Sequence, residues 1–148
     1  MKKIKTVLTA IIMLLSISSF ATEPENVSPV VKAAFESNFT KARVVNWQKT
    51  DEFYFASFLL DNVNVEAAYT ETGELIGTSR KITADEMPLS ISLALAQKYK
   101  GYQVDNSVTE LTFASVTRYY VTVSNEKQAL RHKCLSDAEM QVENKVKR

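Results

Sequence analysis

Apolar residues recur with a helical period in two stretches of the chain. From Val27 to Phe39 they follow the i, i+4, i+8 spacing of an amphipathic helix, and Ser28 with Pro29 suits its N-cap and first turn. A second helix is predicted to begin within residues 85–88 and to end before Gly101. The faces predicted to be buried carry Val31, Phe35 and Phe39 in the first helix, and Ile91, Leu95 and Tyr99 in the second.

The pattern changes to a period of two between the helices, which is typical of strands. Strands are predicted at Arg43 to Gln48, Phe53 to Leu60, Val63 to Tyr69 and Leu75 to Ile82. Asp61-Asn62 forms a two-residue turn, and Gly73 supplies a residue that tolerates positive φ in the next turn. Short turns of this kind join antiparallel neighbours, so the sequence predicts an antiparallel sheet.

The plan of the first half returns in the second half. Phe35 corresponds to Leu95, and after a short insertion between Asn106 and Thr117, Tyr54 corresponds to Tyr119. The sequence therefore predicts an α+β fold made of two tandem copies of a helix packed on a four-stranded antiparallel sheet. We expect the first copy at residues 22–84 and the second at 85–148. Ala138 stands where Gly73 predicts a glycine, which weakens the prediction of a final strand from Met140 to Val146.

The N-terminal segment, up to Ala21, is typical of a secretory signal peptide. Three lysines precede an apolar stretch from Val7 to Ile17, and Ser19-Phe20-Ala21 fits a cleavage site after Ala21. The alternative is an uncleaved anchor, but the stretch is shorter than the ~20 residues that span a bilayer. No cysteine stands directly after this stretch, where a lipid anchor would be attached. We expect a periplasmic or secreted protein without membrane insertion after cleavage.

Cleavage also changes the charge balance. It removes three of the 18 basic residues and leaves 15 against 17 acidic ones. Binding to a phosphate backbone requires a clustered basic surface, and the sequence shows no such stripe. Nucleic acid is therefore not predicted as a partner.

The mature chain holds one histidine and one cysteine, His132 and Cys134. On a strand they share one face, but they supply only two of the three or four ligands that zinc takes from proteins. The thiol has three interpretations, a packed inert side chain, a reactive or dimer-forming group, and a metal ligand. A site that assembles across the halves, for example His132 with Glu66, also stays open.

Acidic motifs do not complete a catalytic or calcium site. Residues 61–64 begin like a calcium loop, but Glu66 replaces its glycine and Thr72 replaces its bidentate carboxylate. The pairs Asp51-Glu52 and Asp85-Glu86 precede predicted elements, where acids cap helices or solvate turns. We therefore predict no metal, no cofactor and no enzyme activity.

Several motifs together resemble a known family. They are Val31 with Ala34-Phe35 and Phe39, then Trp47, Tyr54-x-Ala56-x-Phe58, Val63-x-Val65-Glu66-Ala67-x-Tyr69, Thr72-Gly73-Glu74-Leu75, and Met87-Pro88. This pattern, which covers roughly Val27 to Val146, resembles the beta-lactamase-inhibitor-like, PepSY-like family of small exported proteins typical of Bacteroidetes. The resemblance implies a helix with a four-stranded antiparallel sheet, used twice, whose sheet surface can dock a protein. Inhibition of an enzyme does not follow from the fold alone.

Strand alternation suggests where such docking would occur. If Tyr54 and Tyr119 face the helices, their neighbours point to the opposite, open face. The candidate protein-binding residues are Phe53, Phe55, Leu59, Arg118 and Tyr120. Aromatic and arginine side chains are the types that dominate interfaces. The alternative is that these residues only stabilise the sheet, or that the two halves pack face to face.

The function predicted from these observations is a non-enzymatic binding module. Its expected partner is another exported or envelope protein, such as a peptidase or hydrolase that it would modulate. The alternative function is a periplasmic binder of a small ligand or peptide, held in a cleft between the two copies. Neither the identity of a partner nor the oligomeric state is predicted.

Overall fold

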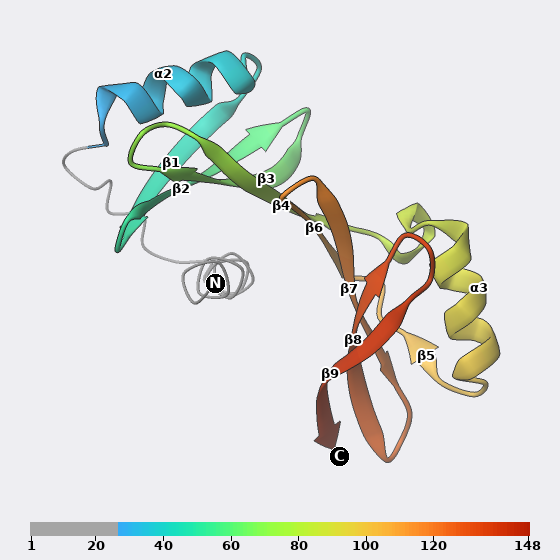
Figure 1. Ribbon diagram of the computed structural model, residues 1–148. Coiled ribbons are helices and arrows are strands. Elements are labelled where there is room, and N and C mark those ends of the chain that lie inside the picture. The colour runs from blue at the N-terminus through green and yellow to red at the C-terminus, as the bar shows by residue number, and fades with distance from the viewer. Residues whose placement is uncertain (1–26) are drawn as a thin grey trace. The chain divides into compact units, whose positions relative to one another are not determined.

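The computed structural model describes residues 27–148 and shows an α+β fold with two α-helices, one short 3-10 helix and nine strands in that range. The predicted signal peptide lies outside the described residues. The strands form a nine-stranded sheet in the order β1-β2-β3-β4-β6-β7-β8-β9, and β5 pairs with β7 off this path (Figure 1).

The prediction of a separate four-stranded sheet in each copy is therefore wrong. One sheet has two edge strands, whereas two sheets would leave four edges with unpaired backbone groups. The chain still divides into two compact units, one ending at Arg80 and the other beginning at Lys81. Each unit has its own helix and its own hydrophobic core.

The first unit combines one helix with four strands. Its elements are α2 (Pro29–Asn38), β1 (Arg43–Thr50), β2 (Phe53–Leu60), β3 (Val63–Thr70) and β4 (Leu75–Ile82), the last of which crosses the boundary between the units. Asp61 and Asn62 both have left-handed φ values, 49° and 66°, as a two-residue hairpin turn with matching twist requires. The predicted turn between β2 and β3 is confirmed.

The first unit buries the helix face that the sequence predicts. Val31 and Phe35 of α2 are buried, and the Phe35 ring centroid lies 4.9 Å from that of Phe58 on β2 and 5.2 Å from that of Trp47 on β1. Both contacts are edge-to-face, the geometry that aromatic quadrupoles favour. Tyr54 and Ala56 join the same core, so alternate residues of β2 face α2.

The second unit begins with a capped turn rather than with its α-helix. Its elements are η1 (Ala84–Glu86), α3 (Leu89–Lys98), β5 (Gln103–Val104), β6 (Val108–Phe113), β7 (Val116–Ser124), β8 (Gln128–Leu135) and β9 (Met140–Lys147). The Glu86 carboxylate accepts the Thr83 backbone N–H at 2.7 Å, which completes a 3-10 turn. The α-helix thus starts at Leu89, a few residues later than predicted.

The core of the second unit lies between α3 and one face of β7 and β8. Ile91 and Leu95 of α3 are buried with Tyr119, Val121 and Val123 of β7. This confirms the predicted helix face and the predicted inward side of β7. The two-residue strand β5 and the longer β6 both pair with β7, as the single strand β1 pairs with β2, and this split produces the fifth strand of the unit.

The strand registers of the two units match at corresponding positions. Tyr54 pairs with Tyr69 in the first unit, and Tyr119 pairs with Cys134 in the second. The turn that follows also recurs, because Gly73 has φ 83° and Ala138 has φ 72°. Ala138 therefore takes the conformation that favours glycine, and the final strand forms all the same, as β9.

Candidate binding surface

Residues on β7 and β8 that point away from α3 form the candidate binding surface. Tyr119 and Val121 face α3, so Arg118 and Tyr120 of β7 lie on the opposite face. Lys133 on β8 pairs directly across from Tyr120, and Arg131 lies on the same strand and the same face as Lys133. We call Arg118, Tyr120, Arg131 and Lys133 the cationic face.

Tyr120 lies at the centre of the cationic face. Its side chain is only 3% exposed, and the Arg131 guanidinium lies 5.4 Å from the centroid of its ring. That distance is within the range of a cation–π contact. Arg118, Arg131 and Lys133 are half-buried, so their charges are partly removed from water.

The cations around Tyr120 lack an ion pair among residues 27–148. Within the described part of the chain, neither Arg118 nor Arg131 nor Lys133 pairs with a carboxylate. Burial raises the pKa of Tyr120, nearby Glu143 raises this pKa further, and Arg118 and Arg131 lower it. The Tyr120 hydroxyl is buried and has no hydrogen-bond partner among the described residues. Arg118, Arg131 and Glu143 thus act electrostatically on a hydroxyl that keeps its proton at neutral pH.

Arg118 is held at the turn between β6 and β7. One guanidinium nitrogen donates to the backbone carbonyls of Val116 at 3.4 Å and Phe113 at 3.5 Å. These contacts orient the side chain but supply no counter-ion from the part of the chain that the structure describes. Arg118 therefore marks one end of the cationic face.

The predicted binding residues of the first unit lie together on β2. Phe53 and Leu59 are half-buried, and Phe55 is 3% exposed, on the face opposite α2. The prediction that Phe55 and Tyr120 are exposed is wrong, although the strand face was assigned correctly. Phe55 lies on an inner strand between its cross-strand neighbours Gln48 and Ala68, and alternation alone says nothing about such packing.

The histidine and the cysteine belong to the core of the second unit. His132 is buried, and its Nε2 lies 2.6 Å from the Tyr99 hydroxyl. Burial lowers the pKa of His132 and raises the pKa of Cys134 to about 11. Such a thiol is a poor nucleophile at neutral pH, which favours the interpretation of Cys134 as a packed side chain. Residues 27–148 hold no group of three His, Cys, Asp or Glu side chains placed to bind a metal.

Two of the grooves in the structure lie beside the helices. A groove of 390 Å³ next to α2 is lined by Phe35, Phe39 and Trp47, with Lys32 and Glu36 among its charged residues. A groove of 500 Å³ next to α3 occupies the corresponding place in the second unit and is lined mainly by apolar and aromatic side chains. Each groove lies within one unit.

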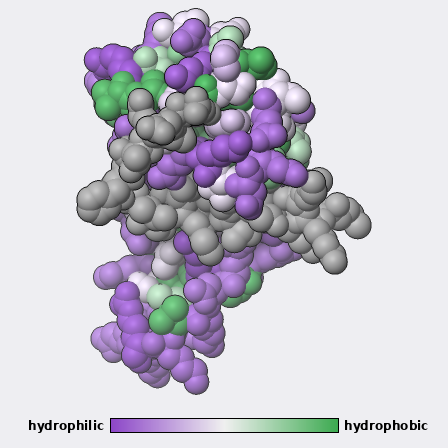
Figure 2. Space-filling model, turned by 90° about the vertical axis from the view of Figure 1, so that its left-hand side faces the viewer, coloured by the Kyte–Doolittle hydropathy of each residue, from purple (hydrophilic) through white to green (hydrophobic). Residues whose placement is uncertain are grey.

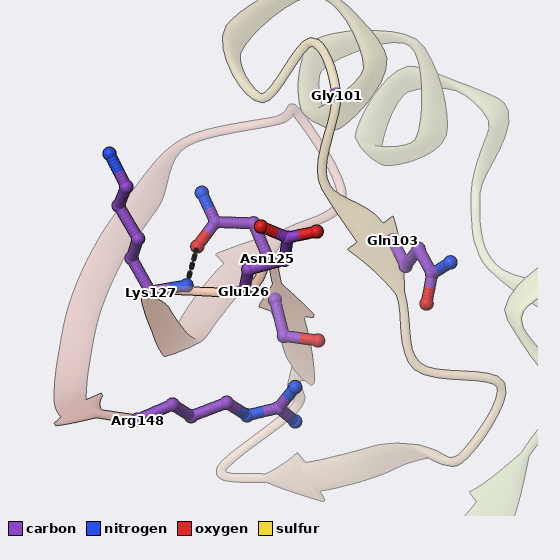
Figure 3. A pocket seen from close by; sticks show the side chains of 7 residues that line it. Gly101, Gln103, Asn125, Glu126, Lys127 and Arg148 are labelled. Atoms are coloured by element: carbon purple, nitrogen blue, oxygen red, sulfur yellow. Dashed lines mark hydrogen bonds between the residues drawn. The ribbon is translucent and has the colours of Figure 1, made fainter.

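A third hollow, of 530 Å³, lies between β5 and the turn that joins β7 to β8 (Figure 3). Its lining is polar and includes Lys127 and Arg148. The Asn125 side-chain oxygen accepts the backbone N–H groups of Lys127 and Gln128, both at 3.0 Å, and so closes the turn. Since this acceptor serves the turn, we assign no ligand to the hollow.

The surface seen in Figure 2 is mostly hydrophilic, and its hydrophobic residues form small separate groups. Among residues 27–148, no helix is long and apolar enough to span a membrane.

Comparison with solved structures places the fold among BLIP-like proteins of Bacteroides. The chain resembles a BLIP-like protein from Bacteroides fragilis with a TM-score of 0.68 and 17% identity, over 82% of this chain and 86% of that one. It also resembles a DUF2874 family protein from Bacteroides uniformis, with a TM-score of 0.68 and 20% identity, over 82% and 90%. The resemblance stated from the sequence is thus confirmed for the fold.

A third similar structure comes from Bacteroides eggerthii and is provisionally described as periplasmic. Its TM-score is 0.68 and its identity 17%, over 82% of this chain and 89% of that one. Comparison with family models and with curated proteins gives no match. At these identities the likeness shows the fold alone.

The residues predicted from the sequence did not include Arg131 and Lys133, which the structure adds to the candidate surface. A signal was present, because both alternate with His132 and Cys134 on a predicted strand and so share the face opposite the core. They lie next to Tyr120 only because β7 pairs with β8, and this pairing cannot be read from β8 alone.

Proposed function

We propose that the protein is an exported, non-enzymatic binding module that docks another envelope protein through the face of its sheet opposite the helices. The observation that carries this proposal is the cationic face of the second unit. Interfaces are enriched in arginine and tyrosine, and electrostatic complementarity speeds and orients association. Three half-buried cations without a carboxylate partner among the described residues favour a partner with an acidic surface.

The positions of the most reactive side chains support binding rather than catalysis. His132 is fully buried, and its Nε2 is engaged by the Tyr99 hydroxyl. Cys134 is also fully buried in the same core. A catalytic base or nucleophile must reach its substrate, so we propose no catalytic role for either residue.

A periplasmic or secreted location agrees with this function. The proposal rests on the signal-peptide pattern of residues 1–21, with cleavage near Ala21, and on the provisional periplasmic description of a structure with the same fold. We further propose that the two units arose by internal duplication, since Tyr54 pairs with Tyr69 as Tyr119 pairs with Cys134.

Chemical crosslinking in the native envelope, with identification of the captured proteins, tests the proposed function. A double variant, Arg118→Ala with Arg131→Ala, should lose the specific partner. The matched control is Lys145→Ala with Lys147→Ala on the exposed edge strand β9, which removes the same charge and should retain it. Equal capture by both variants would refute docking through the cationic face.

A second candidate function is binding of a small apolar ligand in the groove beside α2. Its volume of 390 Å³ lies at the lower end of small-molecule sites, and Phe35, Phe39 and Trp47 give it an aromatic lining. Trp47 is the chain's only tryptophan, so its fluorescence reports directly on this groove. Energy transfer from Trp47 to 1-anilinonaphthalene-8-sulfonate, blocked by Ala42→Phe, would support this function. No transfer, or transfer that survives the blocking substitution, would refute it.

A further inference from the structure

We propose that Tyr120, Arg131 and Lys133 form a subsite for one carboxylate, supplied by an aspartate or glutamate side chain of the docked protein. This inference rests on the proposed function and specifies the chemistry of the partner. It assigns the buried Tyr120 hydroxyl as a hydrogen-bond donor to that carboxylate and the two cations as its counter-charges.

The three side chains are neighbours by strand pairing. Tyr120 of β7 and Lys133 of β8 are direct cross-strand partners, which places their Cβ atoms about 5 Å apart. Arg131 is on the same face of β8, and its guanidinium lies 5.4 Å from the Tyr120 ring centroid. The three side chains therefore share one face of the sheet, and we place the carboxylate of the docked protein among them.

The Tyr120 hydroxyl provides an independent indication of a missing acceptor. Within residues 27–148 it is buried without a hydrogen-bond partner, and a buried polar group in this condition is costly. Burial raises the pKa of Tyr120, so at neutral pH the hydroxyl donates rather than repels an anion. Because Tyr120 is only 3% exposed, a docked carboxylate must displace what covers the hydroxyl, and one of its oxygens then accepts a hydrogen bond from it.

The net positive charge around Tyr120 favours an anion that carries a single negative charge. Arg118 and Arg131 act on Tyr120 as positive charges and Glu143 as a negative charge. Lys133 adds a third positive charge on the strand that pairs with Tyr120. The planar fork of a guanidinium matches the two oxygens of a carboxylate. A multiply charged phosphate backbone would need a longer basic surface than these residues provide.

The test uses the mature protein labelled with ¹³C at the tyrosine ring carbon that carries the hydroxyl. The probe is an acetylated, amidated hexaglutamate peptide, and the uncharged control is the corresponding hexaglutamine. We expect hexaglutamate alone to shift the Tyr120 signal, which Tyr120→Phe identifies by its loss. Because an added hydrogen bond acts on the labelled carbon directly, the shift reports contact rather than general charge.

Variants then separate the subsite from diffuse attraction. Tyr120→Phe and Arg131→Gln should each weaken hexaglutamate binding by at least about 10-fold, since each removes a charge-assisted hydrogen bond. The control Lys147→Gln removes one exposed charge from β9 and should weaken binding by about 2-fold or less. If Arg131→Gln does not fold, Arg131→Lys keeps the charge but not the fork, and it should still lose affinity.

Several results would overturn the inference. They are the absence of a Tyr120 shift, equal losses in Arg131→Gln and Lys147→Gln, and binding of succinate or inorganic phosphate as tight as that of the peptide. Capture of a partner in the envelope that survives Tyr120→Phe would refute the subsite while the docking function stands. A Tyr120 shift with hexaglutamate but no envelope partner would instead refute the docking function.

Discussion

The recurring turn offers a stability test that links both units. Gly73 and Ala138 occupy corresponding positions and both have left-handed φ, 83° and 72°. An L-residue in this region costs roughly 1–2 kcal/mol, whereas glycine adopts it freely. Ala138→Gly should relieve this cost, partly offset by the greater flexibility of glycine in the unfolded chain, about 0.4–1 kcal/mol. We expect a net stabilisation of about 0.5–1 kcal/mol.

The reverse change at Gly73 should cost more. A Cβ at this position would lie 3.1 Å from both the Cγ1 and the carbonyl oxygen of Val30, and 3.4 Å from the Cβ of Ala34, both on α2. Gly73→Ala therefore adds a tight contact with the helix to the backbone cost, and we expect a loss of about 1–3 kcal/mol.

Urea denaturation of the two variants and the wild type, followed by circular dichroism, measures both changes in the free energy of unfolding. Ala138→Ser is the control, because serine also carries a Cβ and therefore keeps the backbone strain. It should leave stability within about 0.5 kcal/mol. Destabilisation by Ala138→Gly, or no effect of Gly73→Ala, would refute the argument that both turns need a left-handed residue.

Three further predictions follow from the burial of single side chains. Phe35→Ala and Leu95→Ala should each lower the free energy of unfolding by about 2–5 kcal/mol in urea denaturation, and a loss under about 1 kcal/mol would mean that the helix face is misassigned. Phe55→Ala should also destabilise, by about 2–4 kcal/mol, because the side chain is 3% exposed; unchanged stability would show that it lies on the surface. The lowered pKa of His132 means that the unfolded chain takes up the proton first, so stability should fall as pH drops below about 6.5. His132→Gln should remove this part of the pH dependence, and an identical pH profile in both proteins would contradict the assignment.

Local elements were predictable from the sequence because local chemistry determines them. Asp61-Asn62 favours left-handed backbone, and it forms the predicted two-residue turn. The apolar spacing around Phe35 and Leu95 placed the buried faces of both helices correctly. The prediction of two separate sheets failed because strand pairing between residues distant in the sequence determines how many sheets form.

The candidate site was only partly predictable for the same reason. Alternation assigns Tyr120 to the face opposite α3, but it does not reveal that Arg131 lies over the ring. That contact depends on the register of β7 with β8, which brings together residues that are distant in the sequence. The start of the second helix was misplaced because Asp85 and Glu86 are typical first-turn residues, and here they serve a 3-10 turn closed by Thr83.

Site-specific photo-crosslinking in the native envelope tests the docking account most directly. A photoreactive amino acid replaces Gln141, an exposed residue of β9 directly across from Lys133 of the cationic face, and the control replaces Leu93, an exposed residue of α3. The account predicts one defined crosslinked protein from position 141, lost in Arg131→Gln and absent from position 93. Equal crosslinking from both positions, or a product at position 141 that persists in Arg131→Gln, would contradict it.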